Sequence, residues 1–151
     1  MVEHLQQVLR PLSSEPLDWS DDELRWLDLM ADSRVVGLGE ATHGTAEFFE
    51  AKHRIFRYLV ERHGFRVFAI EAQFGESLLI DEAIQESRTQ DIEPLMREAM
   101  LFWTWRTEAG KQLLEWMSEY NRGKPAAEKL HYVGFDCQLT DFHRDLLRTY
   151  L

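Results

Sequence analysis

Apolar residues follow two different periods along this chain, and the change of period predicts an α/β fold. Three short runs rich in β-branched and aromatic residues are typical of buried parallel strands, and they cover residues 34–40, 65–71 and 131–136. Between these runs, apolar residues recur every three or four positions, as on one face of a helix. Because strands that alternate with helices form right-handed crossovers, we predict a parallel β-sheet with flanking helices.

Helical periodicity and capping residues predict five helices. These cover residues 21–31, 47–63, 75–87, 91–101 and 106–121. Ser20 and Glu23 form the pattern of a capping box at the start of the first of these helices. This helix would bury Leu24, Leu27 and Ala31. Gly64 is expected to end the second helix as a C-cap. Shorter helices are predicted near both ends, within 1–18 and 140–151, and we expect a single domain over 1–151.

The composition excludes several classes of protein. A net charge of −10 argues against nucleic-acid binding, because affinity for phosphate backbones comes from Lys and Arg. Cys137 is the single cysteine, so no internal disulfide can form. The N-terminus lacks the pattern of a signal peptide, and no apolar stretch is long enough to cross a bilayer. We therefore expect a cytoplasmic protein without a membrane or nucleic-acid partner.

An acidic residue stands at the end of each predicted strand. These residues are Glu40, Glu71 and Asp136. Functional groups gather beyond the carboxyl ends of parallel strands, so the three carboxylates are expected at one edge of the sheet, together with His43. The alternative is that these acids meet water or cap helices, and the pattern alone leaves both interpretations open.

His43 is the leading candidate for catalysis. It precedes Gly44, and a residue without a side chain allows a ligand to approach the turn closely. An imidazole with an ordinary pKa of about 6.5 is suited to general base catalysis near neutral pH. A neighbouring carboxylate would fix its tautomer. A turn histidine that bonds only to the backbone is the alternative.

Four further residues are candidates for binding a substrate. Lys52 and Arg54 would stabilise an oxyanion or a substrate acid, or would instead cover apolar neighbours with their stems. Trp103 and Trp105 belong to an aromatic run that suits a pocket wall, although such a run near a helix start is more often core.

Other catalytic patterns are weaker. The residue types of a metal site are present in Glu40, His43, His53 and Glu71. However, Glu-x-x-His is a loose pattern, and no second histidine stands four residues after His43. Ser77 lacks the second glycine of a nucleophile elbow, and Cys137 is more typical of a buried residue than of a nucleophile. We expect neither a metal nor another cofactor.

A series of motifs resembles the erythromycin esterase family. The series begins with Gly39-Glu40-Ala41-Thr42-His43-Gly44-Thr45, then Glu47-Phe48-Phe49 and Lys52, and continues through Leu59-Val60-Glu61, Gly64-Phe65 and Ala69-Ile70-Glu71. It resumes at Phe102-Trp103-Thr104-Trp105-Arg106-Thr107-Glu108, Leu114-Glu115-Trp116-Met117 and Val133-Gly134-Phe135-Asp136. The resemblance therefore covers about residues 34–138, in the order of the family.

This resemblance implies a hydrolase that opens the macrolactone ring of macrolide antibiotics or cleaves a related ester. It implies that His43 is the general base and that Glu40 and Glu71 belong to the same centre, without a metal. Asp136 is added to the substrate site from its strand-end position. Family members are longer, so the chain is expected to correspond to their N-terminal portion and to end before the C-terminal half.

Two alternatives to catalysis follow. The first is a non-catalytic piece or short paralogue that needs a C-terminal half or a partner, and that self-associates through exposed apolar surface. The second is a metal- or haem-binding module that uses His43 and His53.

Overall fold

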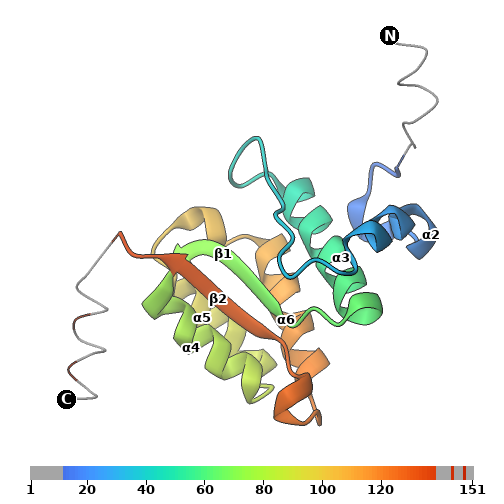
Figure 1. Ribbon diagram of the computed structural model, residues 1–151. Helices are drawn as coiled ribbons and strands as arrows, with labels where there is room; N and C mark the ends of the chain where they lie inside the picture. Colours follow the sequence, from blue (N-terminus) through green and yellow to red (C-terminus); the bar gives the residue numbers. More distant parts are fainter. Residues whose placement is uncertain (1–11, 139–143, 145–147, 149–151) are drawn as a thin grey trace. The chain divides into compact units, whose positions relative to one another are not determined.

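The computed structural model describes residues 12–138, Arg144 and Arg148 (Figure 1). The helices predicted near the two ends of the chain lie largely outside this described part. The described residues form two compact units, and each is described by itself. Unit 1 comprises residues 12–41 and 47–65, and unit 2 comprises residues 42–46 and 66–138. The single domain over residues 1–151 stays a prediction.

Unit 1 is helical. Its elements are η1 (Pro16–Asp18), α2 (Asp21–Leu24), η2 (Arg25–Met30) and α3 (Ala46–His63). Its core consists of buried Leu24, Leu27, Tyr58 and Leu59, with Trp19, Val36, Ile55 and Phe65 packed against them. This core joins α3 to the segment that precedes it in the sequence.

The predicted capping box starts α2. The Ser20 hydroxyl accepts a hydrogen bond from the Glu23 backbone, and the Glu23 carboxylate accepts one from the Ser20 backbone at 2.8 Å. The helix continues as a 3₁₀-helix rather than as the predicted α-helix, and Ala31 is exposed rather than buried. Gly64, with a φ of +74°, confirms the predicted C-cap of α3.

The strand predicted over 34–40 was wrong. Residues 35–40 form neither helix nor strand, and Val35 is exposed. Two glycines, Gly37 and Gly39, weaken a strand because they lose more backbone entropy and offer no side chain to pack. Val36 instead packs against the core of unit 1.

Unit 2 has the predicted α/β class. Its elements are β1 (Val67–Gln73), α4 (Phe74–Gln85), η3 (Thr89–Asp91), α5 (Ile92–Ala99), η4 (Trp103–Trp105), α6 (Glu108–Asn121), η5 (Ala126–Glu128) and β2 (His131–Asp136). The strands β1 and β2 pair in parallel, and α4 packs against both of them (Figure 1). The crossover from β1 to β2 contains α4, α5 and α6, as the sequence pattern predicted.

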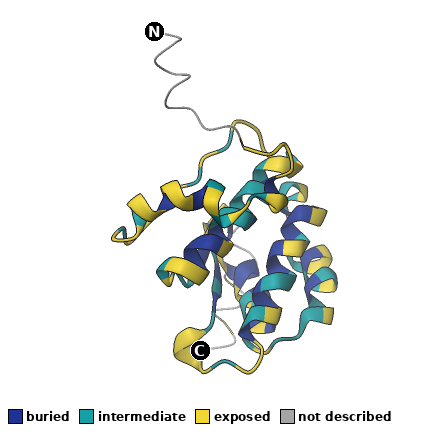
Figure 2. Ribbon diagram, turned by 90° about the vertical axis from the view of Figure 1, so that its right-hand side faces the viewer, coloured by how far each residue is buried: buried dark blue, intermediate teal, exposed yellow. Residues whose placement is uncertain are grey.

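The two faces of the sheet differ in burial. Phe68, Ala72 and Tyr132 are buried on the face toward α4, whereas Val67 and Phe135 are 52% and 65% exposed. Figure 2 shows a similar contrast in the helices, whose turns combine buried and exposed residues. None of the described helices combines the length and apolarity that a membrane crossing requires.

Side chains from two helices hold the start of β2. Asp81 on α4 accepts a hydrogen bond from the Tyr132 backbone at 2.8 Å and lies 3.2 Å from Nδ1 of His131. Buried Asn121 on α6 donates to the Leu130 carbonyl at 2.9 Å and accepts from the Leu130 backbone at 2.7 Å. Since buried backbone groups need partners, these bonds stabilise the entry to the strand.

The end of the sheet contains an irregularity that requires Gly134. The register shifts between Ile70 and Gln73, so β1 bends where it enters α4. A Cβ at Gly134 would lie 2.5 Å from the Ala72 carbonyl oxygen and 2.6 Å from that of Gln73. Both contacts are with backbone, which cannot move away without disturbing the strand.

We therefore expect Gly134→Ala to lower the free energy of unfolding by about 1–3 kcal/mol, the usual cost of overpacking. Urea unfolding of the chain measures this change. Gly37→Ala is the control, because nothing lies within 4 Å of its added Cβ. Equal midpoints for the two variants would contradict the proposed crowding.

Candidate active site

The turn that carries His43 belongs to unit 2. His43 is exposed, and its ring meets Trp105 edge-on with a centroid distance of 5.5 Å and an interplanar angle of 62°. The hydroxyls of Thr42 and Thr45 hydrogen-bond to each other across the turn. The turn therefore presents an imidazole that is open to water on one side and supported by an indole on the other.

Gly44 is constrained in two ways. Its φ of +76° is unfavourable for any residue with a Cβ. In addition, an added Cβ would lie 3.1 Å from Cζ3 of Trp103. Both indoles of the Trp103–Trp105 segment thus contact the His43 turn.

The two tryptophans differ in burial. Trp105 is buried, as the interpretation as core predicts, and its part in a pocket wall stays a prediction. Trp103 is 66% exposed, so that interpretation was wrong for this residue. The reason is that successive positions of a 3₁₀ turn point in different directions, and η4 turns one indole inward and the other toward Gly44 and solvent.

Glu71 and Asp136 stand near the ends of the paired strands. Glu71 is exposed on β1. Asp136 pairs in register with Gln73, and its Oδ1 accepts a hydrogen bond from the Cys137 backbone at 2.8 Å. Its Oδ2 is buried without a hydrogen-bond partner among the described residues. A buried carboxylate oxygen with unused acceptor capacity is suited to receiving a donor from a ligand or from water.

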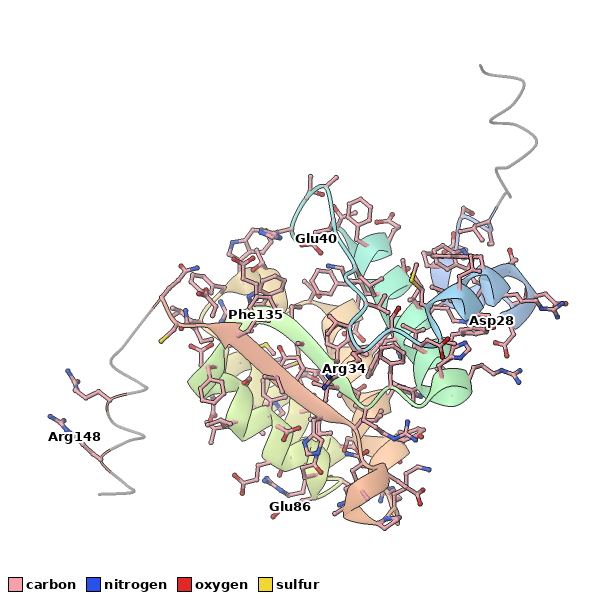
Figure 3. All side chains as sticks on the ribbon, in the orientation of Figure 1. Asp28, Arg34, Glu40, Glu86, Phe135 and Arg148 are labelled. Atoms are coloured by element: carbon pink, nitrogen blue, oxygen red, sulfur yellow. The ribbon has the colours of Figure 1, made fainter. Side chains whose placement is uncertain are left out.

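Glu40 and Lys52 are brought together in unit 1. Glu40, labelled in Figure 3, lies in the loop before α3, and its carboxylate pairs with the Lys52 ammonium. Both side chains are largely buried, at 9% and 12% exposure. The ammonium also lies 5.3 Å from the centroid of the Phe49 ring. The pair therefore places two opposite charges together in a largely buried position.

Arg54 has a structural role in unit 1. It donates to the Trp19 carbonyl and to Asp21, each at 2.6 Å. Hydrogen bonds from Arg62 and then Arg54 lower the pKa of Asp21. Arg54 therefore ties α3 to the start of α2, and its predicted part in substrate binding stays a prediction.

His53 is buried on α3. Burial, with the positive charges of Arg57 and Arg54, lowers the pKa of His53 to about 4. A neutral imidazole is consequently the stable form near pH 7. Among the described residues, no three His, Cys, Asp or Glu side chains gather closely enough to hold a metal ion.

The two candidate nucleophiles differ in their surroundings. Buried Ser77 donates its hydroxyl to the Phe74 carbonyl at 2.7 Å, a bond within the first turn of α4. Cys137 is exposed, so the interpretation as a buried residue was wrong. It directly follows Asp136, the last residue of β2.

Sequence reasoning missed Glu76. This residue lies in the first turn of α4, is only 9% exposed, and accepts a hydrogen bond from the Leu101 backbone at 3.2 Å. One feature of the sequence could have indicated Glu76 as a site residue. It stands five residues after Glu71, beyond the end of the strand, where functional groups gather. The residues around it indicated only a helix start.

Comparison with known proteins gives a consistent result. A model of the erythromycin esterase family matches residues 60–151. Erythromycin esterase type II of Escherichia coli is 35% identical over 123 residues, which are 82% of this chain and 28% of that protein. Erythromycin esterase type I of E. coli is 28% identical over 134 residues, or 89% of this chain and 31% of that protein.

Two solved structures are also similar. A succinoglycan biosynthesis protein superimposes with a TM-score of 0.81 at 28% identity, over 99% of this chain and 37% of that protein. A Bacillus cereus protein has a TM-score of 0.73 at 29% identity, over 91% of this chain and 33% of its own. The chain thus spans about a third of the length of each of these relatives.

The buried Glu40–Lys52 pair leads to a prediction about stability. Lys52→Met should lower the free energy of unfolding by about 3–5 kcal/mol, because it removes the ammonium that pairs with a largely buried carboxylate. Adding Glu40→Gln should restore part of this loss, which a double-mutant cycle measures. Arg57→Met, which removes the exposed Arg57–Glu61 pair of the same helix, should cost only about 0.5 kcal/mol. A similar small cost for Lys52→Met would argue against the buried pair.

The lowered pKa of His53 leads to a prediction about the pH dependence of stability. Between pH 6.5 and pH 4 the unfolded chain binds a proton at His53 that the folded chain does not bind. Stability from this residue is therefore complete above pH 6.5 and is lost as the pH falls to 4, by at most about 3 kcal/mol. His53→Gln should flatten the stability profile in this window. Parallel profiles for the two proteins, measured by urea unfolding, would contradict the lowered pKa.

Proposed function

Since the chain belongs to the erythromycin esterase family, we propose that it is a carboxylic-ester hydrolase in which His43 activates water to open a macrolide lactone or a related ester. The observation that carries this proposal is the position of His43. Its imidazole is exposed on a turn that Gly44 shapes and is supported by the Trp105 ring. A general base must meet water and must also hold a fixed orientation.

The proposed reaction begins when His43 takes a proton from water. The resulting hydroxide attacks the ester carbonyl, and a tetrahedral oxyanion forms. Its collapse breaks the bond to the alkoxide, which takes the proton back from the imidazolium. The products are an alcohol and a carboxylic acid, which releases its proton to solvent as a carboxylate, and the two groups stay in one chain when the substrate is a lactone. No metal or other cofactor enters these steps.

Carboxylates and cations have separate roles in this proposal. We assign to Glu40 and Glu71 the orientation of the water and the stabilisation of the imidazolium, as an acid does in a hydrolase triad. Lys52 and Arg54 are assigned to the oxyanion or to a substrate acid. The pair that Lys52 forms with Glu40 would keep these two charges close to each other.

Substrate contacts are assigned to Trp103, Trp105 and Asp136. The exposed indole of Trp103 offers a flat apolar surface, which suits the hydrocarbon part of a large lactone. The unused Oδ2 of Asp136 would accept a hydrogen bond from a substrate hydroxyl. These contacts would hold the ester near the strand ends.

The second candidate function is that of a non-catalytic piece, which needs a C-terminal half or a partner chain for activity. Val67 and Phe135 favour it, because they expose apolar surface on one face of the sheet. Such surface commonly marks an interface. The relatives are about three times as long as this chain, which is also consistent with a requirement for further residues.

Incubating the chain with a 14-membered macrolide should give a product heavier by one water molecule, measured by mass spectrometry. His43→Ala should lower the rate by a factor of about 10² to 10⁴, the contribution of a general base. Cys137→Ser is the control and should leave the rate unchanged, because water and not the thiol is the nucleophile.

Full activity of His43→Ala would exclude His43 as the base. An inactive wild-type chain that associates with rising concentration would favour the second candidate function instead.

A further inference from the structure

Glu76 occupies an unusual environment for a carboxylate. Glu76 lies in the first turn of α4, directly after β1, and only 9% of its surface is exposed. Burying a charge is unfavourable unless hydrogen bonds or dipoles compensate for it. The N-terminal end of α4 supplies favourable partial charge, and the Leu101 backbone supplies a hydrogen bond of 3.2 Å.

The negative charge of Glu76 also acts on the core. Tyr132 is buried on β2, and burial, followed by the charge of Glu76, raises its pKa above the ordinary value. Glu76 is thus integrated into unit 2 and does not project from its surface.

The partner of Glu76 begins a short, well-defined segment. Leu101 lies two residues before the 3₁₀ turn of η4. Within this turn the Trp105 backbone donates to the Phe102 carbonyl at 3.2 Å, and the Arg106 backbone donates to the Trp103 carbonyl at 3.0 Å. Fixing Leu101 therefore also restricts the position of both tryptophans.

The same segment supports the His43 turn. Trp105 meets the His43 ring, and Trp103 lies against Gly44. A continuous path of contacts consequently runs from the Glu76 carboxylate through Leu101 and η4 to the imidazole.

We propose that Glu76 is a positioning residue that holds the Leu101–Trp105 segment beneath His43. This role rests on the proposed function of His43 as the general base, and Glu76 itself acts without touching the substrate. The residue works as a hydrogen-bond acceptor, so an amide oxygen at this position can replace the carboxylate.

The test compares the ring-proton chemical shifts of His43 in solution by NMR, with His43→Gln used to assign the signals. In the wild-type chain the Trp105 ring current should displace these signals from their random-coil values. Glu76→Ala should move them toward random coil, whereas Glu76→Gln should keep them near the wild-type positions. Glu82→Ala, which removes an exposed carboxylate from the same helix, is the control and should change nothing.

Unchanged His43 signals in a folded Glu76→Ala protein would overturn the proposal, as would equal displacement in the Ala and Gln variants. If Glu76→Ala does not fold, Leu101→Pro removes the donor and leaves Glu76 in place. Met100 already has the extended backbone that precedes proline, with φ −77° and ψ 112°. Displaced His43 signals in this variant support the proposal, and unchanged signals overturn it.

The NMR measurement requires no turnover, so an inactive wild-type chain would count against the proposed hydrolysis without deciding the role of Glu76. Where turnover is present, Glu76→Ala should lower kcat about tenfold with little change in KM, because a misplaced base affects the chemical step. Glu76→Gln should restore kcat.

Discussion

The direct passage from β1 into α4 determines much of unit 2. Gln73 is both the last residue of the strand and the N-cap of the helix, so no loop separates them. The first turn of α4 must therefore lie immediately beyond the strand, which bends to reach it. The bend brings two β1 carbonyls close to Gly134 and leaves no space for a side chain there. It also places Glu76 at the strand end and in the interior.

The charged side chains and the candidate base lie in different environments. Glu40 and Lys52 are paired and largely buried, and Glu76 is held by a backbone donor. His43, by contrast, is exposed and is restrained by an aromatic ring. This contrast agrees with base catalysis, because fixed charges need protection from solvent competition while a base must reach water.

Local chemistry explains what the sequence could predict. The Ser20 capping box and the Gly64 C-cap depend on neighbouring residues alone, so their patterns were sufficient. The segment 35–40 has the composition of a strand, but strand formation requires a partner, and its Val36 is used in a helical core. The exposure of Trp103 and the burial of Glu76 depend on how η4 meets the rest of unit 2, which no short pattern contains. The sequence thus predicted which types of residue form the candidate site. It could not predict their contacts, because these depend on the fold.

The anchoring of β2 by Asp81 affects the order in which the sheet can assemble. The carboxylate that receives the Tyr132 amide belongs to α4, and the residues concerned are 51 positions apart. A helix that binds an amide at the start of a strand helps to specify the alignment of that strand. We therefore expect β2 to take its register only after α4 has formed, so that β1 and α4 together belong to the folding nucleus of unit 2.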